Sequence, residues 1–191
     1  MSETKSTVRE NPEGLNGIDV ARMRQAQDEM RRDPDGAVAK PIHQVAIEWQ
    51  QGYRTRTAVS GGEVIQGDEP TVYGGQGAGA TPQELLLTAV GHCLTATYVG
   101  GLTAAGVAVR SMKVSVSGKV DFRAAYGVEK GHAGFESIQI VVDVDSDASP
   151  ARIDALLDKL LPTAPIPDTI MRPVPLTVKL RHAKPDGGNR G

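Results

Sequence analysis

The chain has 191 residues, of which 39% are hydrophobic, 23% charged and 4% aromatic, and its formal net charge at pH 7 is −2. This length is sufficient for one domain with a sizeable core. A nearly neutral chain lacks the basic face that nucleic acids require, and no apolar run approaches the roughly 18 residues of a membrane span. We therefore expect no nucleic-acid partner and no membrane partner. The first residues lack the apolar stretch of a secretory signal, so we expect a cytoplasmic protein.

Cysteine and histidine usage limits the chemistry further. Cys93 is the single cysteine of the sequence, so neither an intramolecular disulfide nor a multi-cysteine zinc site can form. The four histidines are scattered without metal-ligand spacing, at His43, His92, His132 and His182. We therefore expect no metal ion, no bound cofactor and a reducing compartment.

Composition divides the chain into four parts. Residues 1–16 are polar and are predicted to be a disordered tail. Residues 17–40 are predicted to form a helical arm, in which Asp19 caps a short polar helix. Residues 41–182 contain the alternating and periodic patterns of a folded domain. Residues 183–191 are polar and glycine-rich and are predicted to be a flexible C-terminal tail.

The first half of the domain reads as a small sheet followed by a loop. Apolar and polar residues alternate over 45–50 and again over 53–59, and Gln51 with the following glycine forms a turn, which is typical of a hairpin. A short strand is expected at 64–65. The glycine-rich stretch 67–79 lacks the spacing of a phosphate-binding loop and is predicted to be a flexible connector.

The clearest local signal marks the start of a long helix. Thr81 is an N-cap, Pro82 occupies the first helical position, and Glu84 completes a capping box. The helix is expected to run to about Ala105 with Gly106 as its terminator. Because it is apolar nearly all round, we expect it to be buried as the central element. Close packing against other backbone would offset the helix-propensity cost of Gly91, Gly100 and Gly101.

Two long alternating strands are predicted over 112–122 and 138–144, followed by an amphipathic helix capped by Ser149. A proline-punctuated loop over 162–168 then leads into a last strand over 174–180. The predicted order is β-β-(β)-α-β-β-α-β. This is an α+β fold with antiparallel sheets packed around a long buried central helix.

Cys93 admits two interpretations from the residues alone. Free cysteine is among the most buried residue types, so it could be a small core residue. A reactive role requires the thiolate, and an unperturbed thiol is only a few per cent ionised at pH 7. Cys93 lies too far from the helix N-terminus to benefit from it, and His92 points about 100° away around the helix. An activating cation would have to come from Arg54 or Arg56 in the hairpin.

The segment from Thr81 to Leu94 resembles the cysteine helix of the OsmC/Ohr superfamily, the osmotically inducible and organic hydroperoxide resistance proteins. Further similar segments occur in the family's order across roughly residues 16–180. They are Asn16–Val20 (similar to the N-terminal arm of one OsmC-like subgroup), Asp68–Pro70, Gly74–Gly75, Val116–Asp121 and Ala164–Pro175.

The resemblance implies an intertwined homodimer, with two long central helices packed between sheets and sites near the dimer interface. It also implies that Cys93 attacks a peroxide and becomes sulfenic acid, which a second cysteine converts to a thiol-reducible disulfide. This sequence departs from that pattern. Ala164 occupies the position of the resolving cysteine, and Gln83 that of the assisting glutamate. Arg54 is a loose counterpart of the assisting arginine, with Arg56 as its rival.

Two functions follow as hypotheses. The first is a thiol-dependent, one-cysteine peroxidase that reduces organic or hydrogen peroxides in oxidative stress defence, with an external small thiol in place of the resolving cysteine. The second is a non-catalytic OsmC-fold dimer, either structural or binding a small apolar ligand, that has lost the resolving cysteine and the assisting glutamate.

Overall fold

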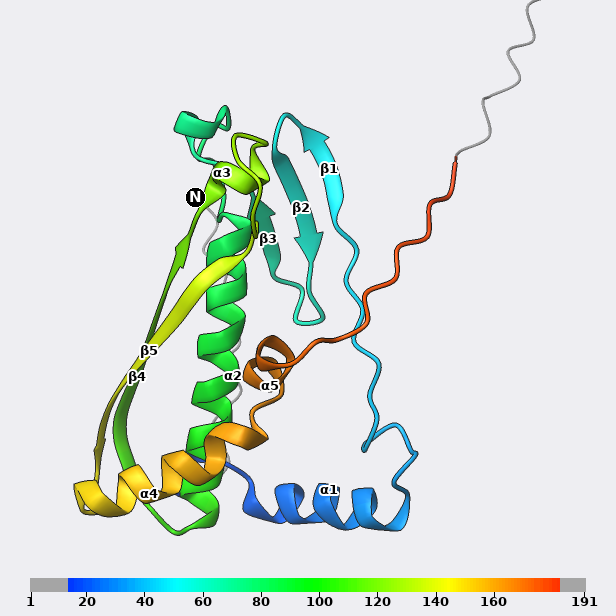
Figure 1. Ribbon diagram of the computed structural model, residues 1–191. Coiled ribbons are helices and arrows are strands. Elements are labelled where there is room, and N and C mark those ends of the chain that lie inside the picture. The colour runs from blue at the N-terminus through cyan, green and yellow to red at the C-terminus, as the bar shows by residue number, and fades with distance from the viewer. Residues whose placement is uncertain (1–13, 183–191) are drawn as a thin grey trace, which may run out of the picture.

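The computed structural model describes residues 14–182, so the predicted C-terminal tail and residues 1–13 lie outside the described part of the chain. Two antiparallel sheets flank a long central helix, and a further helix projects from the body at one end (Figure 1). The helices and strands follow one another as α1 (Val20–Arg32), β1 (Glu48–Gln51), β2 (Arg54–Ala58), β3 (Val64–Gly67), α2 (Pro82–Ala104), β4 (Val109–Val120), α3 (Phe122–Ala125), β5 (Phe135–Ser146), α4 (Pro150–Leu160) and α5 (Pro165–Met171). Short 3-10 turns occur at Leu15–Gly17, Thr71–Tyr73 and Leu161–Thr163.

The smaller sheet confirms the predicted hairpin and short strand. Its order is β1-β2-β3, with both neighbouring pairs antiparallel. Trp49 faces Thr55 across the first pair, and Gly52 in the connecting turn has a φ of +61°, a conformation that glycine adopts without steric cost. The hairpin therefore forms where the alternation and the turn residues predict it.

The long helix α2 begins with the predicted capping box. The Glu84 N–H donates to Oγ1 of Thr81 at 3.2 Å, and the Thr81 N–H donates to Oε2 of Glu84 at 2.8 Å. The backbone N–H of Thr81 is the main reason why the pKa of Glu84 lies below its ordinary value. At the other end Gly106, with a φ of +71°, terminates the helix as expected.

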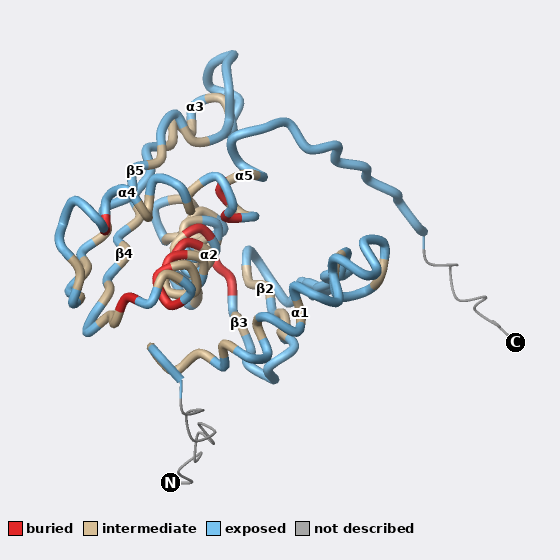
Figure 2. Tube along the Cα trace, turned by 90° about the horizontal axis from the view of Figure 1, so that it is seen from below, coloured by how far each residue is buried: buried red, intermediate tan, exposed pale blue. Residues whose placement is uncertain are grey.

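The larger sheet consists of β4 and β5, two antiparallel twelve-residue strands that lie along α2. Val114 pairs with Val142 in the middle of the ladder, and both side chains pack against the core. The buried hydrophobic residues lie mainly on α2 and at its junctions with α4 and α5, namely Val90, Leu94, Tyr98, Leu102, Val107, Ile153 and Ala164 (Figure 2).

The sequence predicts that α2 is buried on all sides, but within a single chain only one face of the helix is buried. Its buried residues Val90, Leu94, Tyr98 and Leu102 recur every four positions, which places them on one side of the helix. His92 and Ala96, on the opposite side of the helix, are exposed. By length and composition α2 could cross a membrane, but its buried face is packed within the fold in the manner of a core helix.

Two of the three helix glycines are closely packed, but against side chains rather than against backbone as predicted. A Cβ atom at Gly101 would lie 2.3 Å from a Leu160 methyl carbon, and one at Gly91 would lie 3.3 Å from a Val116 methyl carbon. At Gly100 an added Cβ would meet nothing within 4 Å. The side of α2 that carries Gly100 is therefore open in the single chain.

Two predictions for the C-terminal part are wrong. The proline-rich stretch predicted as a loop is largely helical, because Pro165 occupies the first position of α5, where a missing N–H costs nothing. The predicted last strand over 174–180 is extended but pairs with no strand among the described residues. Its apolar side chains are exposed to solvent, Leu176 to 91% and Val178 to 85%. Alternation favours a strand only where a neighbouring strand is available, and residues 14–182 of one chain supply none here.

Phe122, predicted as the end of a strand, begins α3 instead, because the Asp121 side chain accepts the Arg123 N–H and caps a helical turn. The predicted second helix is confirmed, with Ser149 accepting the Arg152 N–H and Pro150 at its first position.

The N-terminal arm is attached through Asn16, although the sequence predicts this residue to lie in the disordered tail. Its side-chain amide donates to Oγ1 of Thr103 at 2.8 Å and to the Val107 carbonyl at 2.9 Å, and its oxygen accepts the Val109 N–H at 2.7 Å. The φ of +56° at Asn16 is one that asparagine tolerates better than most residues. Beyond this anchor α1, capped by Asp19 as predicted, is largely exposed.

Candidate functional site

Cys93 lies in the middle of α2, half-buried against the main core cluster. Its sulfur accepts a hydrogen bond from the backbone N–H of Ile166, with 3.4 Å between nitrogen and Sγ. Ile166 belongs to the first turn of α5, which packs against α2 from a position 73 residues further along the chain. The sulfur thus has a polar partner that sequence spacing could not have suggested.

The first turn of α5 presents this N–H in a fixed direction. Pro165 and Pro167 on either side of Ile166 have no N–H, so Ile166 supplies the donor within this tripeptide. Ala164, just before the turn, is completely buried in the same core cluster that Cys93 packs against, and Pro167 is buried as well. The chain position at which the resemblance places a resolving cysteine is therefore close to the Cys93 sulfur, but it carries a methyl group.

The two candidate arginines lie on β2, and no hydrogen bond or ion pair between described residues joins either of them to Cys93. The Arg54 side chain donates to Oε1 of Gln51 at 3.2 Å, and its Nε is buried without a hydrogen-bond partner in the described structure. Arg56 is exposed and pairs with Glu48 in the ladder. A buried guanidinium nitrogen without an acceptor makes Arg54 the stronger candidate to meet a ligand or a second chain.

Asp68 is a buried acid that fixes the glycine-rich loop, and it was not singled out as a functional residue from the sequence. It is 3% exposed and accepts the backbone N–H groups of Ala78, Glu69 and Gln76 at 2.9 to 3.1 Å. The Ala78 N–H is the main reason why the pKa of Asp68 is lowered, and the positive charge of Arg54 adds to this effect. The loop predicted as a flexible connector is therefore wound around one carboxylate.

We expect Asp68→Asn to lower the melting temperature at pH 7 by about 5 °C, because an amide offers one acceptor oxygen where the carboxylate offers two. Since the folded-state pKa of Asp68 is lowered, its ionised form stabilises the fold above the ordinary aspartate pKa, and that stabilisation is lost as the pH falls through the lowered value. Thermal melts of both proteins from pH 7 to pH 2 should therefore converge at the acid end. Curves that stay parallel would contradict this role.

A cleft of about 330 Å³ opens at the N-terminal end of α2, roughly 15 Å along the helix from Cys93. Gln83, the counterpart of the assisting glutamate, lies in its wall together with Glu84 and Leu87. Its remaining walls are mostly apolar and come from the glycine-rich loop and the β4–β5 hairpin, including Pro70, Tyr73, Val120, Phe122 and Phe135. This aromatic cleft can accommodate an apolar group beside the neutral side-chain amide of Gln83.

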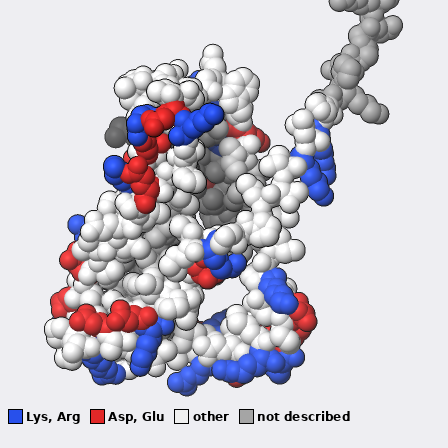
Figure 3. Space-filling view, in the orientation of Figure 1, with Lys and Arg blue, Asp and Glu red and all other residues white. Residues whose placement is uncertain are grey.

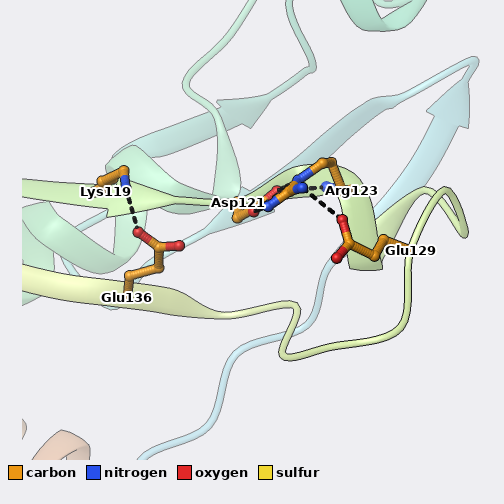
Figure 4. A network of polar contacts seen from close by, with 5 residues as sticks. All are labelled: Lys119, Asp121, Arg123, Glu129 and Glu136. Atoms are coloured by element: carbon orange, nitrogen blue, oxygen red, sulfur yellow. Dashed lines mark hydrogen bonds and ion pairs between the residues drawn. The ribbon is translucent and has the colours of Figure 1, made fainter.

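Aromatic stacking and ion pairs hold the hairpin end of this cleft together. The Tyr73 ring lies 5.2 Å from that of Phe122 and 5.5 Å from that of Tyr126. Beside them, Arg123 pairs with both Asp121 and Glu129, and Lys119 pairs with Glu136 (Figure 4). The hydrogen bond from Arg123 lowers the pKa of Asp121 to about 2. These exposed pairs contribute little stability individually, but they fix the loop that carries the aromatic residues.

On the face seen in Figure 3, charged side chains gather at the upper end, where the ion-pair network lies, and along the lower end, which includes the arginine-rich α1, with a smaller charged group between them. Within residues 14–182, no three or more His, Cys, Asp or Glu side chains are grouped to hold a metal ion.

Comparison with known proteins places this arrangement in a family. The sequence profile described as OsmC-like protein matches residues 75–179, just over half of the chain. No curated protein matches the chain. Among solved structures, an OsmC-like protein from Mycoplasma pneumoniae is 17% identical, with a TM-score of 0.60 over 69% of this chain and 89% of that one.

Two further structures share the fold. An organic hydroperoxide resistance protein OsmC from Legionella pneumophila is 13% identical, with a TM-score of 0.54 over 69% of this chain and 91% of that one. A protein from Aquifex aeolicus is 18% identical, with a TM-score of 0.55 over 68% of this chain and 87% of that one.

The chain thus shares the α+β fold of these structures, and its long helix, which packs against the β4–β5 sheet, carries Cys93. The chain belongs to the OsmC-like protein family.

Proposed function

We propose that the protein is a one-cysteine thiol peroxidase that reduces organic or hydrogen peroxides in the cytoplasm as part of oxidative stress defence. The observation that carries this proposal is the position of the Cys93 sulfur, which is half-buried in the central helix and hydrogen-bonded to a directed backbone N–H. An N–H donor stabilises negative charge on sulfur, and the thiolate is the form that attacks a peroxide.

The working form in this proposal is a homodimer. One chain leaves four apolar side chains exposed along the segment 173–182, namely Val174, Leu176, Val178 and Leu180, and Leu86 of α2 is 38% exposed. Arg54 in the same chain is directed toward Gln51 and Asp68 rather than toward Cys93. We propose that two antiparallel α2 helices bring the Cys93 of one copy near Arg54 and the aromatic cleft of the other.

In the proposed reaction the Cys93 thiolate attacks one peroxide oxygen, the O–O bond breaks, and the alcohol or water leaves with a proton. Cys93 is then a sulfenic acid. A small external thiol displaces the hydroxyl group as water and forms a mixed disulfide, and a second thiol releases reduced Cys93 and the oxidised thiol pair. The aromatic cleft would hold the organic group of the peroxide, and no cofactor takes part.

The test is stopped-flow consumption of cumene hydroperoxide with an excess of a small dithiol. We expect Cys93→Ser to lose the protein-dependent rate by two orders of magnitude or more, because the serine hydroxyl is not ionised at neutral pH. Thr97→Ser, one turn further along α2, is the matched control and should retain the rate. Equal rates for the parent and Cys93→Ser would refute the peroxidase proposal.

A second candidate function is non-catalytic binding of a small apolar ligand, and the aromatic cleft beside Gln83 favours it. In that case Cys93 should react slowly with peroxide and with alkylating reagents, while an apolar ligand should raise the melting temperature. Tyr73→Ala should abolish this thermal shift without changing the reactivity of Cys93.

A further inference from the structure

We infer that the backbone nitrogen of Ile166 takes the place of the missing resolving cysteine, by forming a covalent S–N bond with oxidised Cys93. This inference rests on the proposed function, since it requires Cys93 to be oxidised by a peroxide. The S–N bond would also protect oxidised Cys93 from further oxidation to sulfinic acid.

The geometry places the nitrogen where a resolving atom is needed. Ile166 N is 3.4 Å from Cys93 Sγ, and its N–H bond is directed at the sulfur. Replacing that hydrogen by sulfur keeps the direction and requires only a shortening of the separation. Ala164, at the position of the resolving thiol, has no group that can displace hydroxide from sulfenic acid.

The protein holds this nitrogen in place from both sides. Ala164 and Pro167 are buried, and the Ala164 carbonyl accepts the Asp168 N–H as the first helical bond of α5. The Ile166 N–H is not needed for a helical hydrogen bond, because the first backbone donors of a helix have no intrahelical acceptor. Converting it to N–S therefore breaks no bond of the helical ladder.

The step balances without a further oxidant. Sulfenic acid and the amide condense, so that the S–O and N–H bonds break, the S–N bond forms and one water molecule leaves, while the oxidation level of sulfur stays the same. An external thiol then attacks sulfur and breaks the S–N bond, and the nitrogen takes up a proton. A second thiol releases reduced Cys93 and a disulfide of the external thiol.

Intact-protein mass spectrometry after one equivalent of hydrogen peroxide, without thiol, tests this directly. The S–N form is about 2 Da lighter than the reduced chain, since two hydrogens are lost. Because Cys93 is the single cysteine, an intramolecular disulfide cannot give this mass. Trypsin should yield one cross-linked species that joins residues 57–110 to residues 160–179, and a reducing thiol should separate it again.

The matched variants are Ile166→Val, which keeps the N–H, and Ile166→Pro, which removes it. We expect the lighter species in Ile166→Val, whereas Ile166→Pro should instead accumulate sulfinic acid, about 32 Da heavier, and should be inactivated by excess peroxide about tenfold faster. A backbone ester at 166, which replaces the N–H by oxygen and keeps the isoleucine side chain, guards against misfolding of the proline variant. It should also lack the lighter species.

Trapping with dimedone separates this inference from the proposed function. Sulfenic acid that is trapped in the parent without any lighter species would overturn the role of Ile166 and leave the peroxidase proposal intact. The lighter species in the ester variant would also overturn it. If the parent forms neither sulfenic acid nor the lighter species, both proposals are refuted.

Discussion

Ala164→Cys should allow an internal disulfide to form with Cys93. Ala164 is completely buried in the core cluster against which Cys93 packs, and the hydrogen bond from Ile166 to the sulfur brings the two segments together. The new bond closes a loop of about 70 residues, which restricts the unfolded chain by about 4 kcal/mol. We expect the melting temperature of the oxidised variant to rise by about 10 °C over its reduced form.

The measurement is a thiol titration with thermal melts before and after one equivalent of peroxide. Thr163→Cys is the matched control, because Thr163 is adjacent in sequence but exposed, and it should gain no internal disulfide. The engineered thiol should also compete with the Ile166 nitrogen, so fragmentation of the cross-linked tryptic peptides should place the bond at residue 164 and no longer at the Ile166 nitrogen. If both thiols remain free after peroxide treatment, residue 164 does not lie close enough to Cys93 to form a disulfide, which would contradict the structure.

Local signals predicted most of the fold. The Thr81–Glu84 capping box, the Ser149 cap and the alternation of the long strands each depend on residues within one or two turns, and the structure confirms them. Pro165 is ambiguous in the sequence, because proline is common in loops but also favours the first helical position, and that ambiguity explains the wrong prediction at α5. A local pattern predicts an element reliably only where the alternative interpretation is physically excluded.

The site could be predicted only in part. The resemblance singled out Cys93, and the structure places Ala164 in the core cluster beside it. The Ile166 donor acts across 73 positions through a backbone N–H, which every residue except proline has, so no residue pattern indicates it. The Asn16 anchor is a side-chain amide whose partners lie at least 87 positions away, so local spacing does not identify them. Asp68 carried a signal that was interpreted too narrowly, because an acid before a glycine-rich loop can bind several loop N–H groups at once.

Replacing Leu176 and Val178 by aspartate together should dissociate the proposed homodimer. Both side chains are almost fully exposed in one chain, and they alternate along an extended segment that has no strand partner among the described residues. Strand addition to a second copy would satisfy the backbone and bury this apolar face, whereas two buried carboxylates would oppose it. We expect the dissociation constant to rise at least about 100-fold in sedimentation velocity experiments.

Thr177 and Lys179 provide the control, because they alternate with the apolar residues and therefore face the other side of the segment. Their double aspartate variant should remain a dimer. If Arg54 reaches Cys93 only across the dimer, dissociation should also slow sulfenic acid formation, and the rate should recover as protein concentration is raised. A monomeric parent, or a Leu176 and Val178 variant that reacts at the parental rate at every concentration, would show that each chain activates its own sulfur.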